Sequence, residues 1–203
     1  MAVAEWAMNN DISADVAVQT RLLEETMVRM AVDFPCPMGG YGGGFRTWLF
    51  EPDKLIDYRT GEYSNGRCPY NSFGNGSAMR TSSIGWLYDD LETTMRVAET
   101  ASEITHNHPE GIKGAQSVSA AIFMARNGAG KDEIKEYIQS VFRYNLDVPW
   151  EHLHKTYGWD SSCQGTVPQA IIAFFASEDF ESAIRRAISL GGDSDTLACI
   201  TGS

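Results

Sequence analysis

The chain has 203 residues, of which 43% are hydrophobic and 21% are charged, proportions that are typical of a folded globular protein and exclude a disordered chain. Its 16 basic and 27 acidic side chains give a formal net charge of −11, which repels phosphate backbones and argues against a nucleic-acid partner. No apolar run approaches the roughly 20 residues of a membrane-spanning helix, and the N-terminus lacks a basic signal region, so we expect no membrane partner.

Helical periodicity dominates the chain, and alternation of apolar and polar residues over the length of a strand is nearly absent. We expect Asp11 or Ser13 to cap the first long helix and Asp179 to cap the helix over 180–190. The sequence therefore predicts one all-α domain. In chain order, apolar spacing predicts helices over 13–32, 91–104, 116–126, 131–144, 168–177, 180–190 and 197–203.

One long stretch, residues 35–76, reads as irregular, since it is rich in glycine and contains turn dipeptides such as Asn65-Gly66 and Asn75-Gly76. A loop of this length inside a compact domain is usually functional or disordered.

The four cysteines, Cys36, Cys68, Cys163 and Cys199, stand far apart and form neither a C-x-x-C pair nor a zinc-binding spacing. We interpret them as reduced thiols of a cytoplasmic protein. A nucleophilic Cys163 would need a neighbouring base and a lowered pKa, and the sequence indicates neither, so we expect a packed thiol.

The segment Gly191-Gly192-Asp193-Ser194-Asp195-Thr196 follows one predicted helix and opens the next. Two ionised carboxylates two positions apart repel each other unless a cation lies between them. Asp193, Asp195 and Thr196 offer three oxygen atoms, which a hard divalent ion prefers. The alternative is that Asp193 or Asp195 only caps the last helix, and the spacing alone does not decide between the two.

Two further segments are candidates for ligand binding. His106 and His108, two positions apart, do not share a helical face and form no zinc pair; they either bind a polar ligand from a loop or are ordinary capping or surface residues. The glycines of Phe73–Arg80 precede a helix, which exposes backbone N–H groups that favour anions, although no Walker motif is present. His152 and His154 flank an aromatic-rich turn and are expected at the surface.

Four blocks in this order, namely SFGNGSAMR, ITHNHPEGIKGAQ, SCQGTVPQAIIAFF and AISLGGDSDTLACITGS, resemble the ADP-ribosylglycohydrolase family. The resemblance implies a single orthogonal multi-helix bundle around a cleft with two ions, Mg²⁺ or Mn²⁺. It implies hydrolysis of the bond between ADP-ribose and an acceptor, so the expected partner is an ADP-ribosylated protein or an ADP-ribose-containing small molecule. By the same resemblance the metal ligands are Asp193, Asp195 and Thr196, Asp193 also has a catalytic role, and ADP-ribose is bound by Gly74, Asn75, Gly76, Ser77, Met79 and His106.

The chain departs from the family pattern at both ends. The family carries a helix with a Gly-Asp motif and a Thr-Asp-Asp-Thr run before a helix that resembles residues 1–8, and this sequence contains no Thr-Asp-Asp run. The family's last helix also continues beyond the position of Ser203. We therefore expect a 1–203 domain without those parts. The alternatives are a catalytically impaired relative or fragment that only binds ADP-ribose or a partner, and a metal phosphohydrolase of another lineage, which would need more ligands.

Overall fold

The computed structural model describes residues 1–203 and contains helices and two isolated β-bridges, which confirms the all-α prediction. No helix is both long enough and apolar enough to span a membrane. The elements in chain order are α1 (Ala2–Asn9), α2 (Val16–Asp33), α3 (Gly43–Phe50), the 3₁₀ helix η1 (Pro52–Lys54), α4 (Gly76–Met79), α5 (Ser82–Leu87), α6 (Leu91–Glu103), α7 (Pro109–Arg126), α8 (Lys131–Phe142), α9 (Trp150–Thr156), α10 (Cys163–Phe175), α11 (Phe180–Ser189) and α12 (Ser194–Thr201).

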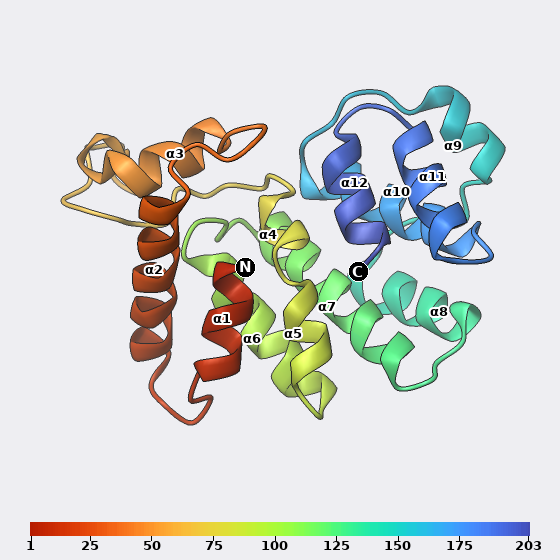
Figure 1. Ribbon diagram of the computed structural model, residues 1–203, viewed down its shortest axis with the longest axis horizontal. Coiled ribbons are helices and arrows are strands. Elements are labelled where there is room, and N and C mark those ends of the chain that lie inside the picture. The colour runs from red at the N-terminus through yellow and green to blue at the C-terminus, as the bar shows by residue number, and fades with distance from the viewer.

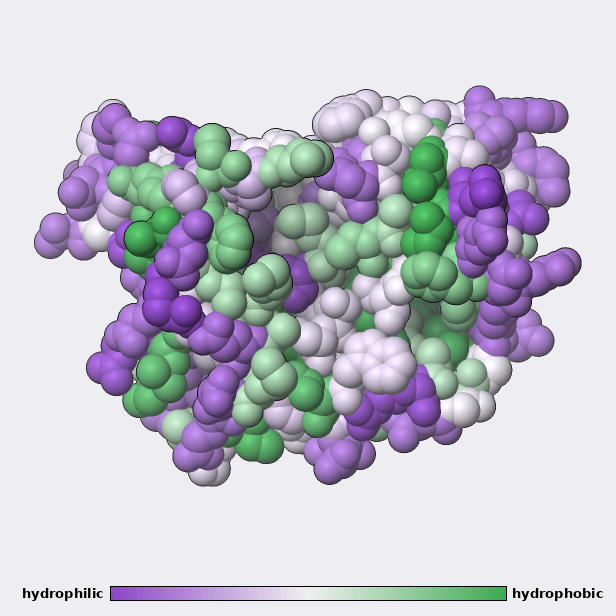
Figure 2. All heavy atoms as spheres, viewed as in Figure 1, coloured by the Kyte–Doolittle hydropathy of each residue, from purple (hydrophilic) through white to green (hydrophobic).

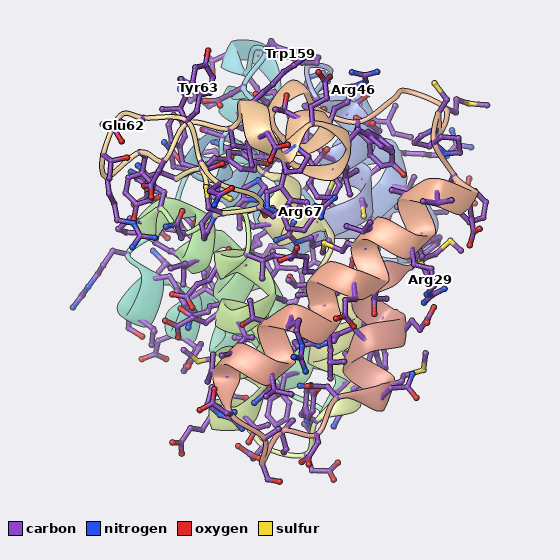
Figure 3. The ribbon with its side chains drawn as sticks, turned by 90° about the vertical axis from the view of Figure 1, so that its left-hand side faces the viewer. Arg29, Arg46, Glu62, Tyr63, Arg67 and Trp159 are labelled. Atoms are coloured by element: carbon purple, nitrogen blue, oxygen red, sulfur yellow. The ribbon has the colours of Figure 1, made fainter.

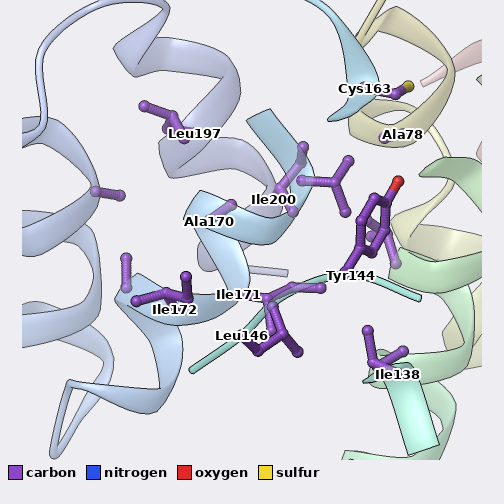
Figure 4. Packing of buried hydrophobic residues seen from close by; sticks show 14 of the residues in the cluster. Ala78, Ile138, Tyr144, Leu146, Cys163, Ala170, Ile171, Ile172, Leu197 and Ile200 are labelled. Carbon is purple, nitrogen blue, oxygen red and sulfur yellow. The ribbon is translucent and has the colours of Figure 1, made fainter. Parts of the chain in front are cut away.

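The buried apolar side chains form two clusters. The N-terminal core contains 14 buried residues, contributed mainly by α1, α2, α3, α5 and α6. The C-terminal core contains 20, contributed mainly by α7, α8, α10, α11 and α12, and Figure 4 shows part of it. α4 and α7 lie at the centre of the molecule, where N-terminal and C-terminal elements meet (Figure 1).

Helix starts follow local capping chemistry. α11 begins as predicted, because the Asp179 side chain accepts a hydrogen bond from the Ser182 backbone N–H and Ser182 Oγ accepts one from the Asp179 backbone N–H, forming a capping box. The start predicted at Ser13 was wrong: Asp11 accepts from the Ser13 N–H within a turn, and Asp15 caps α2 by accepting from the Ala17 N–H.

Two helices begin earlier than the apolar pattern predicted. α7 starts at Pro109, seven positions before residue 116, because small residues such as Gly111 and Gly114 fill positions that pack closely and therefore carry no large apolar side chain. α10 starts at Cys163 with Ser162 as its cap, so Pro168 lies inside the helix and not at its start. His152 and His154 are exposed as expected, but they belong to α9 and not to a turn.

The stretch 35–76 is not wholly irregular, since it contains α3 and η1. The glycines at 39–44 obscured the helical pattern of α3 in the sequence. Its apolar side chains Trp48 and Leu49 are buried. Arg67, beside α3 in Figure 3, donates from Nε to the Trp48 carbonyl (3.0 Å) and from Nη2 to the Leu49 carbonyl (2.8 Å). These bonds satisfy carbonyls that a helix C-terminus leaves free, so a residue distant in sequence completes α3.

Candidate functional site

A cavity of about 710 Å³ opens between the α1–α3 side of the molecule and the start of α12. Figure 2 shows the surface hollowed between these two sides. Eight of the nine site residues predicted from the sequence line this cavity: Gly74, Asn75, Gly76, Met79, His106, Asp193, Asp195 and Thr196. The ninth, Ser77, lies beneath it, fully buried, where its hydroxyl donates to the Gly111 carbonyl at 2.8 Å.

Asp193 is joined to a residue 118 positions away. The buried Asn75 side chain donates from Nδ2 to Asp193 Oδ2 at 2.5 Å and to Thr166 Oγ1 at 2.9 Å. Asp193 occupies the N-cap position of α12, but its side chain makes no capping hydrogen bond. The sequence left open whether Asp193 caps the last helix or belongs to a ligand pair. Its carboxylate does not cap α12, because it bonds to Asn75 instead.

The turn before Asp193 depends on glycine. Gly191 and Gly192 have φ of 73° and 60°, the left-handed region that a side chain disfavours. A Cβ on Gly192 would also lie 3.0 Å from Tyr157 Cε1. This turn connects the end of α11 to the start of α12 and places Asp193 and Asp195 at the cavity.

Burial raises the pKa of Asp193, and the neighbouring Asp195 carboxyl raises it further, while the hydrogen bond from Asn75 opposes both. Asp195 is exposed, and Thr196 is buried with its Oγ1 3.6 Å from Met79 Sδ. No group of three or more histidine, cysteine, aspartate or glutamate side chains converges anywhere in the chain. Within this cavity Asp193 and Asp195 are the only acidic side chains.

The two histidines have different environments. His108 caps α7, since its Nδ1 accepts from the Glu110 backbone N–H at 3.1 Å. His106 is 5% exposed and lines the cavity, and its Nδ1 lies 2.7 Å from Thr105 Oγ1. Burial, together with the positive charge of Arg80, lowers the pKa of His106 to about 2, so this imidazole is neutral.

The loop at 73–76 is held by α10. The Asn75 N–H donates to the Ser161 carbonyl and the Cys163 N–H to the Phe73 carbonyl, each at 2.8 Å, and the Gly74 N–H donates to Ser72 Oγ. The backbone N–H groups of Gly74 and Asn75, which the sequence suggested as anion donors, therefore already have hydrogen-bond partners within the protein. Cys163 is fully buried and donates to the Gly74 carbonyl, and burial raises its thiol pKa to about 11. This confirms a packed thiol and not a nucleophile.

Sequence reasoning missed the opposite wall of the cavity. Tyr41 and Phe45 line it with their rings 5.7 Å apart, edge to face, and Phe45 stacks on Trp48. Arg80 and Tyr70 also line the cavity. The available signal was the pair of aromatic residues within and directly after the glycines of 39–44.

The sequence model of a family described as ADP-ribosylglycohydrolase matches residues 1–203. The chain is 26% identical to the ADP-ribosylhydrolase ARH3 of Mus musculus, over 82% of this chain and 58% of that protein. It is 28% identical to the ADP-ribosylarginine hydrolase Tri1 of Pseudomonas putida, over 71% of this chain and 48% of that protein. The chain therefore spans about half the length of the curated relatives it matches.

An uncharacterized protein of Archaeoglobus fulgidus is 31% identical over 63% of this chain and 47% of its own length. A solved structure described as an ADP-ribosylglycohydrolase-related protein complex matches 99% of this chain and 65% of its own, with a TM-score of 0.66 and 20% identity. At this identity the structural match shows a shared fold.

Proposed function

Because this chain belongs to the ADP-ribosylglycohydrolase family, we propose that it acts in the hydrolysis of the bond between ADP-ribose and a protein side chain or small acceptor. The observation that carries the proposal is the hydrogen bond from Asn75 to Asp193. It joins two of the four sequence blocks at one cavity, which a third block enters through His106. A cavity of about 710 Å³ lies within the 300–1,000 Å³ typical of small-molecule sites.

The donor set fits one hard divalent cation, Mg²⁺ or Mn²⁺. Asp193 and Asp195 both line the cavity at the start of α12, where the Asp195 carboxyl raises the pKa of Asp193, and Thr196 adds a hydroxyl oxygen in the same wall. Two close carboxylates with no basic side chain bonded to either need a cation to offset their repulsion. A second ion would need further oxygen ligands, since this chain brings no third acidic side chain to the cavity.

When bound, such an ion would act as a Lewis acid that binds ribose hydroxyls and lowers the pKa of a water molecule. In the proposed reaction a water oxygen bonds to the anomeric carbon of the ribose, and the bond from that carbon to the acceptor breaks. Asp193, held by Asn75, is placed to accept the proton that the water loses, and the acceptor leaves with a proton. The neutral His106 and the cavity-lining residues of the Gly74–Met79 segment bind the ligand without adding negative charge beside its phosphates.

Calorimetric titration of ADP-ribose into the 203-residue chain, with and without Mg²⁺ or Mn²⁺, tests the proposal. We expect binding that needs the cation and is lost in Asp195→Ala, while Asp132→Ala, an exposed α8 residue outside this cavity, keeps it. The purified chain is then incubated with peptides ADP-ribosylated on arginine or on serine, and release of ADP-ribose is measured. Absence of binding from a cooperatively folded sample would contradict the proposal, and binding without release would support the alternative of a binding protein.

A further inference from the structure

Arg80 and the adjacent residues Thr105 and His106 form a short series of hydrogen-bonded side chains beside the cavity. Arg80 follows α4 and donates from Nη2 to Thr105 Oγ1 at 2.9 Å, and the same oxygen lies 2.7 Å from His106 Nδ1. Thr105 is fully buried. Arg80 also donates to the carbonyls of Ala101 (2.5 Å) and Ser102 (3.2 Å), so its guanidinium is fixed against the end of α6.

The direction of each hydrogen bond follows from which atoms can donate. A guanidinium has only donors, so Thr105 Oγ1 must accept from Arg80. The threonine hydroxyl then has one hydrogen left, and no acceptor other than His106 Nδ1 lies within hydrogen-bond distance of it. If Nδ1 carried the proton instead, it would donate to Oγ1, and the buried Thr105 hydrogen would have no partner. The satisfied arrangement has Nδ1 as the acceptor.

We infer that Arg80 and Thr105 are positioning residues that fix His106 as the Nε2–H tautomer, so that its N–H faces the cavity as a hydrogen-bond donor. The orientation of the ring supports this. His106 Nε2 has no hydrogen-bond partner in the protein and is not among the fully buried unpartnered atoms, so it is open to the cavity that His106 lines. A Cβ on Gly76 would lie only 3.3 Å from this nitrogen.

The backbone around His106 is equally constrained. The His106 N–H donates to the Ser102 carbonyl at 2.8 Å, and Ser102 Oγ donates to the His106 carbonyl at 2.9 Å. These bonds fix the backbone of His106, and the contact between Nδ1 and Thr105 Oγ1 fixes its ring, so a ring flip that turned Nδ1 toward the cavity would break that contact. A donor fixed in this way suits an acceptor oxygen of the ligand, such as a phosphate or ribose oxygen; this last step rests on the proposed function.

Long-range ¹H–¹⁵N correlation spectra of the free, histidine-labelled chain test the tautomer directly. The His106 signals are identified by their loss in His106→Asn. We expect a protonated Nε2 and an unprotonated Nδ1. A protonated Nδ1 or an imidazolium near neutral pH would overturn the inference. Because no ligand is present, this result does not depend on whether the chain binds ADP-ribose.

Two substitutions test the positioning role of Thr105. Thr105→Ser keeps the hydroxyl and should preserve the tautomer, with ADP-ribose affinity within about twofold of the parent. Thr105→Val removes the hydroxyl and should give mixed tautomers and an affinity about tenfold weaker, the value of one lost hydrogen bond. If Thr105→Val is folded and keeps the parent tautomer, the assignment of Thr105 is wrong. If Thr105→Val fails to fold, the spectrum of the parent chain still decides the tautomer. If the tautomer is as expected but the parent binds no ADP-ribose, the proposed function fails and this inference stands.

Discussion

At the scale of single residues, Asn75 has the most demanding position, because its side-chain amide donates both to the buried Thr166 of α10 and to the half-buried Asp193 at the N-cap of α12. Replacing it with alanine leaves the Asp193 carboxylate and the Thr166 hydroxyl without their donor. We expect Asn75→Ala to lower the free energy of unfolding by about 1–3 kcal/mol, the cost of leaving buried polar groups unpaired. Urea unfolding at pH 7 measures the change.

Asn9→Ala is the matched control, since Asn9 is exposed and its amide donates only to the Glu5 carbonyl within α1. This control should change the free energy of unfolding by less than about 0.5 kcal/mol, as surface substitutions do. Equal effects of the two substitutions would show that the contact between Asn75 and Asp193 does not stabilise the fold.

The burial of His106 predicts how the stability of the fold depends on pH. Its pKa is about 2 in the folded chain, against 6.5 in the unfolded chain, because burial and the charge of Arg80 disfavour the imidazolium. Between these values only the unfolded chain binds the proton, so stability falls as the pH falls below about 6.5. At pH 5 the loss from this one group is about 2 kcal/mol relative to pH 8.

The measurement is the difference in unfolding free energy between the parent and His106→Asn, taken from pH 8 to pH 5. Subtracting the variant removes the contributions of the carboxyl groups, which titrate in both proteins. The difference should shrink by about 2 kcal/mol toward pH 5. A difference that stays constant with pH would mean that His106 takes up its proton equally well in the folded state.

The residue types at the site could be predicted from the sequence, but their partners could not. The spacing of Asp193 and Asp195 allowed either a cap or a ligand pair, and the choice became visible only when Asn75 was found against Asp193. The same holds for His106 and His108, which are two positions apart. His106 is buried and lines the cavity, whereas His108 caps α7. Contacts between residues more than a hundred positions apart, such as Asn75 and Asp193, leave no local pattern in the sequence.

At the scale of helices, the approach of α7 to α10 depends on Gly114. A Cβ at this position would lie 2.5 Å from Cys163 Sγ and 2.9 Å from its Cβ. Gly114→Ala gains up to about 1 kcal/mol of helix propensity but overpacks a buried contact, which costs about 1–3 kcal/mol. We expect a net loss of stability in chemical unfolding, and a partial recovery when Cys163→Ala is added.

Gly158→Ala provides the comparison, because an added Cβ there meets nothing within 4 Å. It should leave the free energy of unfolding nearly unchanged. Stabilisation by Gly114→Ala would indicate that the two helices separate easily and that this contact does not set their distance.

Helices with a clear apolar stripe and a local cap, such as Phe180–Ser189, could be placed from the sequence to within a residue. Those that pack through small residues could not. The first turns of α7 carry Gly111 and Gly114, and α3 follows a run of glycines, so neither segment shows the period that marks a helix. Close packing removes the large side chains on which that period depends.

At the scale of the molecule, the cavity lies where the two cores meet, and its shape depends on how firmly they are joined. α7 joins them: a Cβ on Gly85 of α5, whose neighbour Ile84 is in the N-terminal core, would lie 2.7 Å from Ile122 of the C-terminal core. Ser119 Oγ of α7 also donates to the Thr81 carbonyl at 3.2 Å. α5 and α7 are therefore closely packed against each other, and this contact links the two cores.

We therefore predict that residues 1–203 unfold as one cooperative unit, as the single-domain interpretation of the sequence requires. Hydrogen exchange in increasing urea, followed by mass spectrometry on peptides from α2 and α10, measures the opening of each core separately. If the cores unfold together, the most protected amides of both helices exchange with the same free energy and the same urea dependence. If α10 stays protected where α2 has already exchanged, the cores are independent units. In that case the Asn75–Asp193 contact is formed by the docking of two units, and ligands in the cavity should slow the exchange of α2 more than that of α10.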